Sequence, residues 1–124
     1  MIQFKNKADE AKYPFLDYRL KWILELAGAW FSNHNCPVLL VTDFDTPGVH
    51  MPGSAHYDRR GGDLRRPAVL SVCEEFAMFV NKFFDYGNHK LVVIVGSLDP
   101  AGKHDDHIHI QVPSPYRNQG KINL

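Results

Sequence analysis

The segment His107-Ile108-His109 carries two imidazole side chains separated by one residue. If the segment is a β-strand, both imidazoles point to the same face, because side chains alternate along a strand. Upstream, His56 and Asp63 add a third imidazole and a carboxylate. A mononuclear zinc site that acts on a substrate takes three His, Asp or Glu ligands and keeps one position open for water. The sequence therefore predicts a zinc site with His56, Asp63 and His109 as its ligands.

A zinc site of this kind does hydrolytic chemistry, because the bound metal lowers the pKa of its water towards ~7 and polarises a carbonyl group. A nearby base then takes a proton from that water and returns it to the leaving amine. Asp106 and His107 are both candidates for this catalytic role. His107 is well aimed, whereas Asp106 points away on an ideal strand and can serve only if the strand begins irregularly. Nickel, cobalt or manganese would also accept imidazole and carboxylate ligands.

The elements that must position these residues follow from the spacing of apolar side chains. Helical spacing predicts two helices, and short alternating or β-branched runs predict three or more strands. Between the first strand and the second helix, residues 43–62 are rich in Gly, Pro, Asp and His and show no periodicity, which is typical of a functional loop. The predicted helices cover 17–33 and 67–87, and the predicted strands cover 38–42, 90–95 and 106–112.

These elements predict an α+β fold: a small, mostly antiparallel sheet with the two main helices on one face and the zinc site on the other. The last strand would place His107, His109 and Gln111 together on one face. The 124 residues suffice for one domain, so we expect a single domain. Its motif-bearing core spans 38–112, and its tail, 113–124, is expected to be extended.

The composition argues against several classes of protein. Fourteen Lys and Arg residues balance fourteen Asp and Glu residues, so neither nucleic acid nor an anionic membrane is expected as a partner. No run approaches the ~20 apolar residues that span a bilayer. The first residues lack the apolar stretch of a secretory leader, so we expect synthesis in the cytoplasm. Cys36 and Cys73 suggest neither a thiolate zinc site nor a disulfide framework. The protein is expected to be a monomer.

The two motifs together resemble those of a family of zinc peptidases. Ser54-x-His56 followed by Asp63, and then His107-x-His109, is similar to the pattern of the D-alanyl-D-alanine carboxypeptidases and L-alanyl-D-glutamate peptidases, a branch that includes phage endolysins. Lysostaphin-type enzymes and the hedgehog domain are related to this branch. The resemblance implies the same three metal ligands and a zinc-dependent peptidase that hydrolyses short peptides containing D-amino acids, as in peptidoglycan stems.

The resemblance also implies roles for residues around the metal. Asp106 occupies the slot where the carboxypeptidase branch has a catalytic Glu, and His107 occupies the slot of a catalytic histidine in the lysostaphin branch. Ser54 matches the serine of the first motif, which makes a supporting contact. The family usually has an Arg after the strand that precedes this motif, and here Arg59 or Arg60 would take its place as a substrate contact.

Substrate recognition is expected to involve the basic residues near the first motif. Arg59 and Arg60 would clamp carboxylates of the stem peptide, and His50 would line the substrate site. An endolysin-like protein would be phage-encoded and released to the cell wall. The alternative function is a catalytically weak, zinc-stabilised binding module of the same fold, which the hedgehog domain illustrates.

Overall fold

The computed structural model of the chain describes residues 1–45, 59–87, 89–99, 102, 104 and 106–113. These residues form helices and a five-stranded sheet, so the predicted α+β class is confirmed. The elements in chain order are β1 (Ile2–Phe4), α1 (Lys7–Lys12), the 3-10 turn η1 (Tyr13–Phe15), α2 (Tyr18–Ser32), β2 (Leu39–Asp43), β3 (Gly61–Arg65), α3 (Leu70–Phe83), β4 (Val93–Ile94), the 3-10 turn η3 (Gly96–Leu98) and β5 (His107–Gln111).

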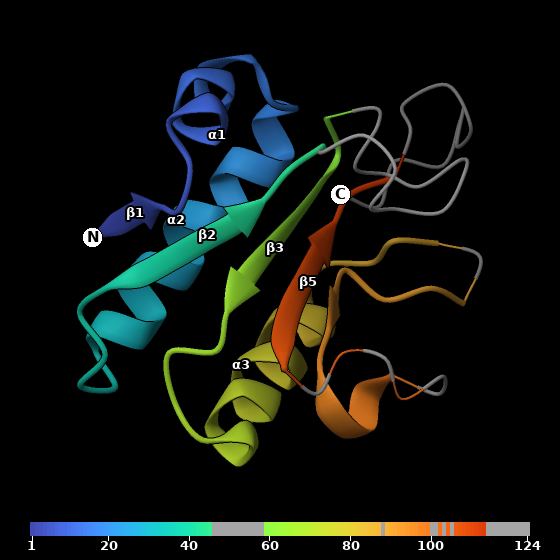
Figure 1. Cartoon of the computed structure of the whole chain (residues 1–124). Helices are drawn as coiled ribbons and strands as arrows, with labels where there is room; N and C mark the ends of the chain where they lie inside the picture. The colour runs from blue at the N-terminus through green and yellow to red at the C-terminus, as the bar shows by residue number, and fades with distance from the viewer. Residues whose placement is uncertain (46–58, 88, 100–101, 103, 105, 114–124) are drawn as a thin grey trace.

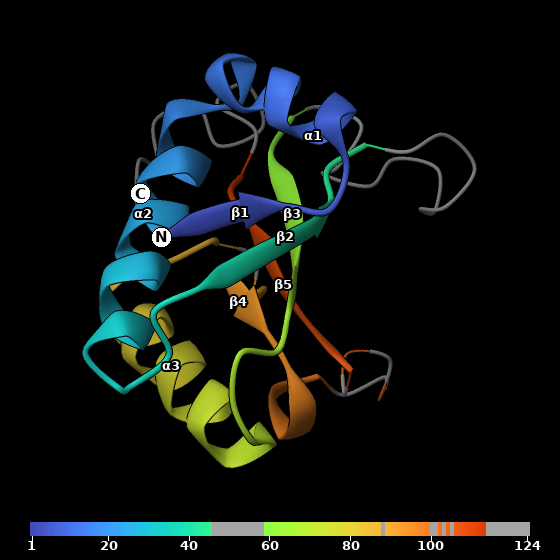
Figure 2. The ribbon, with the colours of Figure 1, turned by 60° about the vertical axis from the view of Figure 1, so that its left-hand side comes forward.

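The sheet has the strand order β1-β2-β3-β5-β4 (Figures 1 and 2). Only β1 and β2 pair in parallel, while β2 with β3, β3 with β5 and β4 with β5 are antiparallel. The prediction of a mostly antiparallel sheet is therefore confirmed. The edge strand β1 and the short helix α1 were not expected, because segments this short contain too few residues to show a hydrophobic period.

Helices α2 and α3 cover one face of the sheet, as the two views of the ribbon agree (Figures 1 and 2). The core lies between these layers, because each helix turns one apolar stripe towards the alternate side chains of the strands. Burying each large apolar side chain contributes about 1.5–3 kcal/mol relative to leaving it exposed. The fully buried side chains include Leu20, Leu24 and Phe31 of α2, Phe76 and Val80 of α3, Leu64 of β3, and Ile108 and Ile110 of β5.

Helix α2 matches the helix predicted over 17–33, and its first turn shows why it begins where it does. The Asp17 carboxylate accepts a hydrogen bond from the Arg19 backbone N–H at 2.9 Å and two more from the Arg19 guanidinium. Burial alone would raise the pKa of Asp17, but these hydrogen bonds outweigh it and hold that pKa below its usual value. The guanidinium also donates to the Pro113 carbonyl at 2.6 Å, which ties the helix start to the end of β5.

Helix α3 is shorter than the helix predicted over 67–87. It begins at Leu70, where the Val69 carbonyl accepts the first hydrogen bonds of the helix. It ends at Phe83 because Phe84 has an extended backbone with φ −124° and ψ 126°. Gly87 was expected to end the helix, but it has φ 91° and forms a tight turn instead. Glycine suits that turn because a positive φ strains most L-residues.

The strand predicted over 90–95 is reduced to the two residues of β4. Hydrogen bonds from the Asn81 side chain of α3 take the place of strand pairing along the edge of β4 that faces away from β5. Its Oδ1 accepts hydrogen bonds from the Val92 and Val93 N–H groups at 3.0 Å, and its Nδ2 donates to the Val93 carbonyl at 2.9 Å. Helix α3 is thus bonded directly to the main chain that leads into β4.

The long stretch 43–62 begins and ends in the sheet rather than being irregular throughout. Asp43 ends β2, and β3 begins at Gly61. Gly62 lets the Phe44 ring pack closely on β3, because a Cβ there would lie 3.2 Å from that ring and would require it to shift by a few tenths of an ångström. The residues between, 46–58, and the predicted extended tail from 114 onwards lie outside the described residues. In the part of the chain that the structure describes, no helix is both long and apolar enough to cross a membrane.

Candidate functional site

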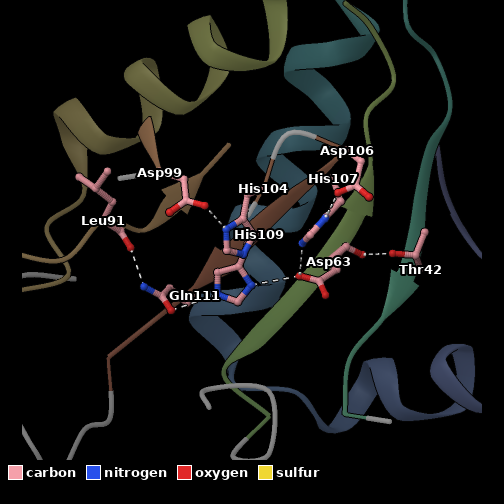
Figure 3. Close-up of polar contacts among 9 residues, drawn as sticks. All are labelled: Thr42, Asp63, Leu91, Asp99, His104, Asp106, His107, His109 and Gln111. Atoms are coloured by element: carbon pink, nitrogen blue, oxygen red, sulfur yellow. Dashed lines mark hydrogen bonds and ion pairs between the residues drawn. The ribbon is translucent and has the colours of Figure 1, made fainter. Parts of the chain in front are cut away.

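Strands β3 and β5 bring Asp63 and His109 side by side. The antiparallel register pairs Asp63 with His109 and Arg65 with His107. Neighbouring residues of the same strands, such as Leu64 and Ile108, face the helices and are fully buried. The polar side chains therefore point to the opposite face of the sheet (Figure 3). This arrangement is the one that the alternation along the strands predicted for the two histidines.

The Asp63 carboxylate lies between two imidazoles. Its Oδ1 is 3.0 Å from Nδ1 of His109 and 3.9 Å from Nε2 of His107 (Figure 3). The Thr42 hydroxyl of β2 donates to the Asp63 carbonyl at 3.2 Å and so fixes the main chain at this point. Only 7% of His109 is exposed. One carboxylate and one imidazole are thus held at close range in a largely dry environment.

Asp106 lies just before β5 and shares its site with His107. The Asp106 Oδ1 is 2.6 Å from Nδ1 of His107, and the Asp106 side chain is 89% exposed. The hydrogen bond with His107 and the charge of that ring lower the pKa of Asp106. The strand was expected to turn Asp106 away unless it began irregularly. Asp106 lies before the first residue of β5, so its side chain can reach Nδ1 of His107. This contact leaves Nε2 of His107 directed towards Asp63.

His104 forms a second Asp–His pair beside these rings. Its Nδ1 lies 2.7 Å from Oδ2 of Asp99, whose side chain is only 8% exposed. The His104 ring centroid is 4.8 Å from that of His107 and 5.4 Å from that of His109 (Figure 3). The sequence places His104 in the turn before the last strand, where it could line the cleft, but it does not reveal the Asp99 partner. The available signal was the occurrence of three histidines between positions 104 and 109, but the Asp99 partner depends on how the preceding turn folds.

The turn η3 positions His104, and helix α3 holds that turn. The Glu74 side chain accepts hydrogen bonds from the Ser97 N–H, at 2.7 Å, and from the Ser97 hydroxyl. These bonds lower the pKa of Glu74. Gly96 has φ 56°, and its N–H donates to the His104 carbonyl at 2.9 Å. A Cβ at Gly96 would lie 2.7 Å from Oε2 of Glu74, so a glycine here leaves room for the hydrogen bonds between Glu74 and Ser97.

Gln111, the last residue of β5, contacts the other side of His109. Its Oε1 lies 3.0 Å from Nε2 of His109, and its Nε2 donates to the Leu91 carbonyl at 2.9 Å (Figure 3). The sequence placed Gln111 on the histidine face but did not indicate this contact. Both nitrogens of His109 therefore have a defined polar neighbour, Asp63 on one side and Gln111 on the other.

An open cavity of about 300 Å³ lies beside this group of residues. A register shift between Val41 and Asp43 of β2 marks a bulge or irregularity, which re-aims side chains locally. Among the described residues, three carboxylates and one guanidinium line the cavity, and their charges favour a cation. The lining residues are Thr42, Asp43, Asp63, Arg65, Asp106 and His107.

Three of the four arginines of this region, Arg59, Arg60 and Arg65, lie in different environments. Arg60 is 7% exposed and donates to the Val112 carbonyl at 2.7 Å. Arg59 is exposed and has φ 60°. Arg65 is the arginine that lines the cavity. Of the two predicted substrate contacts, Arg60 is directed to the main chain instead, and the role of Arg59 stays a prediction.

Three predicted site residues, His50, Ser54 and His56, lie outside the described residues. The structure therefore brings together two of the three predicted metal ligands, Asp63 and His109. Among the described residues alone, no group of three or more His, Cys, Asp or Glu side chains is arranged to hold a metal ion.

The spacing of Asp63 and His109 is compatible with the predicted zinc site. Two ligand atoms that each lie about 2.0–2.2 Å from a tetrahedral zinc are roughly 3.4 Å apart. The observed separation of Asp63 Oδ1 and His109 Nδ1 is 3.0 Å, so a small adjustment would let both atoms bind one metal. The donor set, one imidazole nitrogen and one carboxylate oxygen, is also the chemistry that zinc prefers.

No known family model matches the chain. Comparison with curated proteins and with solved structures likewise finds no significant match.

Proposed function

We propose that this protein is a zinc-dependent peptidase with His56, Asp63 and His109 as metal ligands. The observation that carries the proposal is the Asp63–His109 pair, held at 3.0 Å on the face of the sheet opposite the two helices, with His107 beside it. Zinc held there would supply a water of lowered pKa and polarise a peptide carbonyl. The negative charge of the cavity beside the pair supports a cation at this place.

In this proposal His107 moves the proton and Asp106 orients His107. The contact with Asp106 uses Nδ1 of His107, so Nε2 is the atom that faces Asp63 and the cavity. Asp106 faces Nδ1 of His107 at 2.6 Å, so its carboxylate is placed to orient that ring. The Asp99–His104 pair lies close enough to this ring to stabilise charge that develops beside it.

The proposed substrate is a short peptide of the peptidoglycan stem, cleaved by a monomeric protein. The resemblance of the two sequence motifs to cell-wall peptidases supports this class of substrate. Arg65 supports it independently, because a guanidinium at the edge of the cavity can bind a peptide carboxylate through two hydrogen bonds. Arg65 thereby replaces Arg60 as the proposed substrate contact.

The test measures the zinc content of the purified full chain beside Asp63→Ala and His109→Ala. His34→Ala serves as the matched control, because His34 is exposed and lies on α2's C-terminal side, away from the cavity. We expect one zinc per chain, retained in the control and lost in both site variants. Cleavage of purified stem peptides should then be abolished by a chelator and restored by zinc.

Two results would count against the peptidase. A wild-type protein that binds no metal under any condition would remove the proposal entirely. A protein that binds zinc through Asp63 and His109 but cleaves no stem peptide would instead be the zinc-stabilised binding module.

A further inference from the structure

The amide of Gln111 has only one orientation that satisfies both of its contacts. The Leu91 carbonyl can only accept a hydrogen bond, so the NH2 group of the amide must face it, at 2.9 Å. The amide oxygen is then the atom that lies 3.0 Å from Nε2 of His109. Turning the amide over would set two carbonyl oxygens against each other. The backbone of Gln111 is also fixed, because its N–H donates to the Val92 carbonyl at 2.9 Å.

This orientation determines where the hydrogen of His109 lies. An amide oxygen only accepts, so Nε2 of His109 must carry a hydrogen atom. A neutral imidazole carries a hydrogen on one nitrogen only, which leaves a lone pair on Nδ1. That lone pair faces the Asp63 carboxylate at 3.0 Å. Two acceptors face each other favourably only with a cation between them, either a second proton on the ring or a bound metal.

We propose that Gln111 is a positioning residue of the metal site: it holds the hydrogen of His109 on Nε2 and so keeps Nδ1 as the nitrogen that binds the metal together with Asp63. The inference rests on the proposed metal site for its function. Groups that accept a hydrogen bond from the second nitrogen of a ligating histidine fix the ring and raise its basicity, and their loss typically weakens metal binding 10–100-fold.

The competing explanation is that Gln111 merely joins β5 to the main chain at Leu91. A joining role predicts a loss of stability in Gln111→Leu without any change in the hydrogen position on His109. The positioning role predicts a change at His109 itself, because the neutral ring would be free to place its hydrogen on Nδ1 and donate it to Asp63.

The first experiment locates the hydrogen in metal-free, 15N-labelled full chain by two-bond 1H–15N correlation spectra of the imidazoles. In the wild type we expect Nε2 of His109 to carry a hydrogen whether the ring is neutral or charged. In Gln111→Leu the neutral ring should shift towards the form with its hydrogen on Nδ1. A wild-type His109 with no hydrogen on Nε2 would overturn the inference, and this result does not depend on whether metal binds.

The second experiment measures the zinc dissociation constant by competition with a chromogenic chelator. We expect about 10–100-fold weaker binding in Gln111→Leu. Gln111→Glu should keep the hydrogen on Nε2, because a carboxylate oxygen still accepts it, but this variant cannot donate to the Leu91 carbonyl and should lose stability. Gln3→Leu makes the same chemical change on the exposed edge strand β1 and should match the wild type.

The outcomes separate this inference from the proposed function. Absence of zinc binding in the wild type contradicts the proposed function, while the spectra still decide the role of Gln111. Equal zinc affinity in the wild type and a folded Gln111→Leu variant would refute the positioning role and leave the proposed metal site intact. If Gln111→Leu does not fold, the wild-type spectra carry the test: a His109 ring without a hydrogen on Nε2 refutes the inference.

Discussion

Replacing Asn81 with alanine is expected to destabilise the protein by about 3 kcal/mol. The Asn81 side chain makes three hydrogen bonds to the main chain at Val92 and Val93, two accepted at 3.0 Å and one donated at 2.9 Å. Both valines are fully buried, so water cannot easily replace the lost partners. A net contribution of about 1 kcal/mol for each hydrogen bond gives the expected sum. For a chain of this size, the melting temperature should fall by roughly 10 °C.

The assay is equilibrium unfolding in urea, followed by tryptophan fluorescence. The midpoint of Asn81→Ala should move to lower urea while the slope of the transition stays unchanged, because the surface exposed on unfolding is nearly the same. Met78→Ala is the control, since Met78 lies on the same helix with 54% of its surface exposed. A loss below about 1 kcal/mol in Asn81→Ala would refute the reasoning, because it would mean that β5 alone holds the Val92 segment.

Three further predictions concern the site and its supports. His107→Ala should lower kcat by about 10²–10⁴-fold and retain zinc. Stopped assays on stem peptides measure kcat, and metal analysis of the same protein measures zinc. An unchanged kcat would exclude His107 from proton transfer. The pKa of Asp17 lies below 3.8, so its stabilisation is present above about pH 4 and is lost as the pH falls through the folded value; Asp17→Asn should flatten the pH dependence of unfolding in this range. Gly96→Ala should destabilise the protein more than Gly102→Ala in thermal unfolding. Both glycines have a positive φ, but only a Cβ at Gly96 would lie 2.7 Å from Glu74. Equal losses of about 1–2 kcal/mol would mean that backbone strain alone is responsible.

The sequence was sufficient for the features that depend on local periodicity. Apolar spacing identified α2 closely, and alternation along β5 placed His107, His109 and Gln111 on one face with the isoleucines on the other. These features follow from 3.6 residues per helical turn and two per strand repeat, which the covalent geometry of the chain imposes on any sequence. The ends of α3 and the short β4 were less predictable, because side chains such as Asn81 compete with the regular hydrogen-bond ladder.

The tertiary structure decided which distant residues meet. Asp63 lies opposite His109 only because β3 and β5 pair in one register, and a shift of one residue would turn Asp63 towards the helices. The same register directs Arg65 to the cavity, while Arg60 is held at the Val112 carbonyl. That register is selected by long-range packing of buried side chains between the sheet and two helices, a free energy that no local pattern contains.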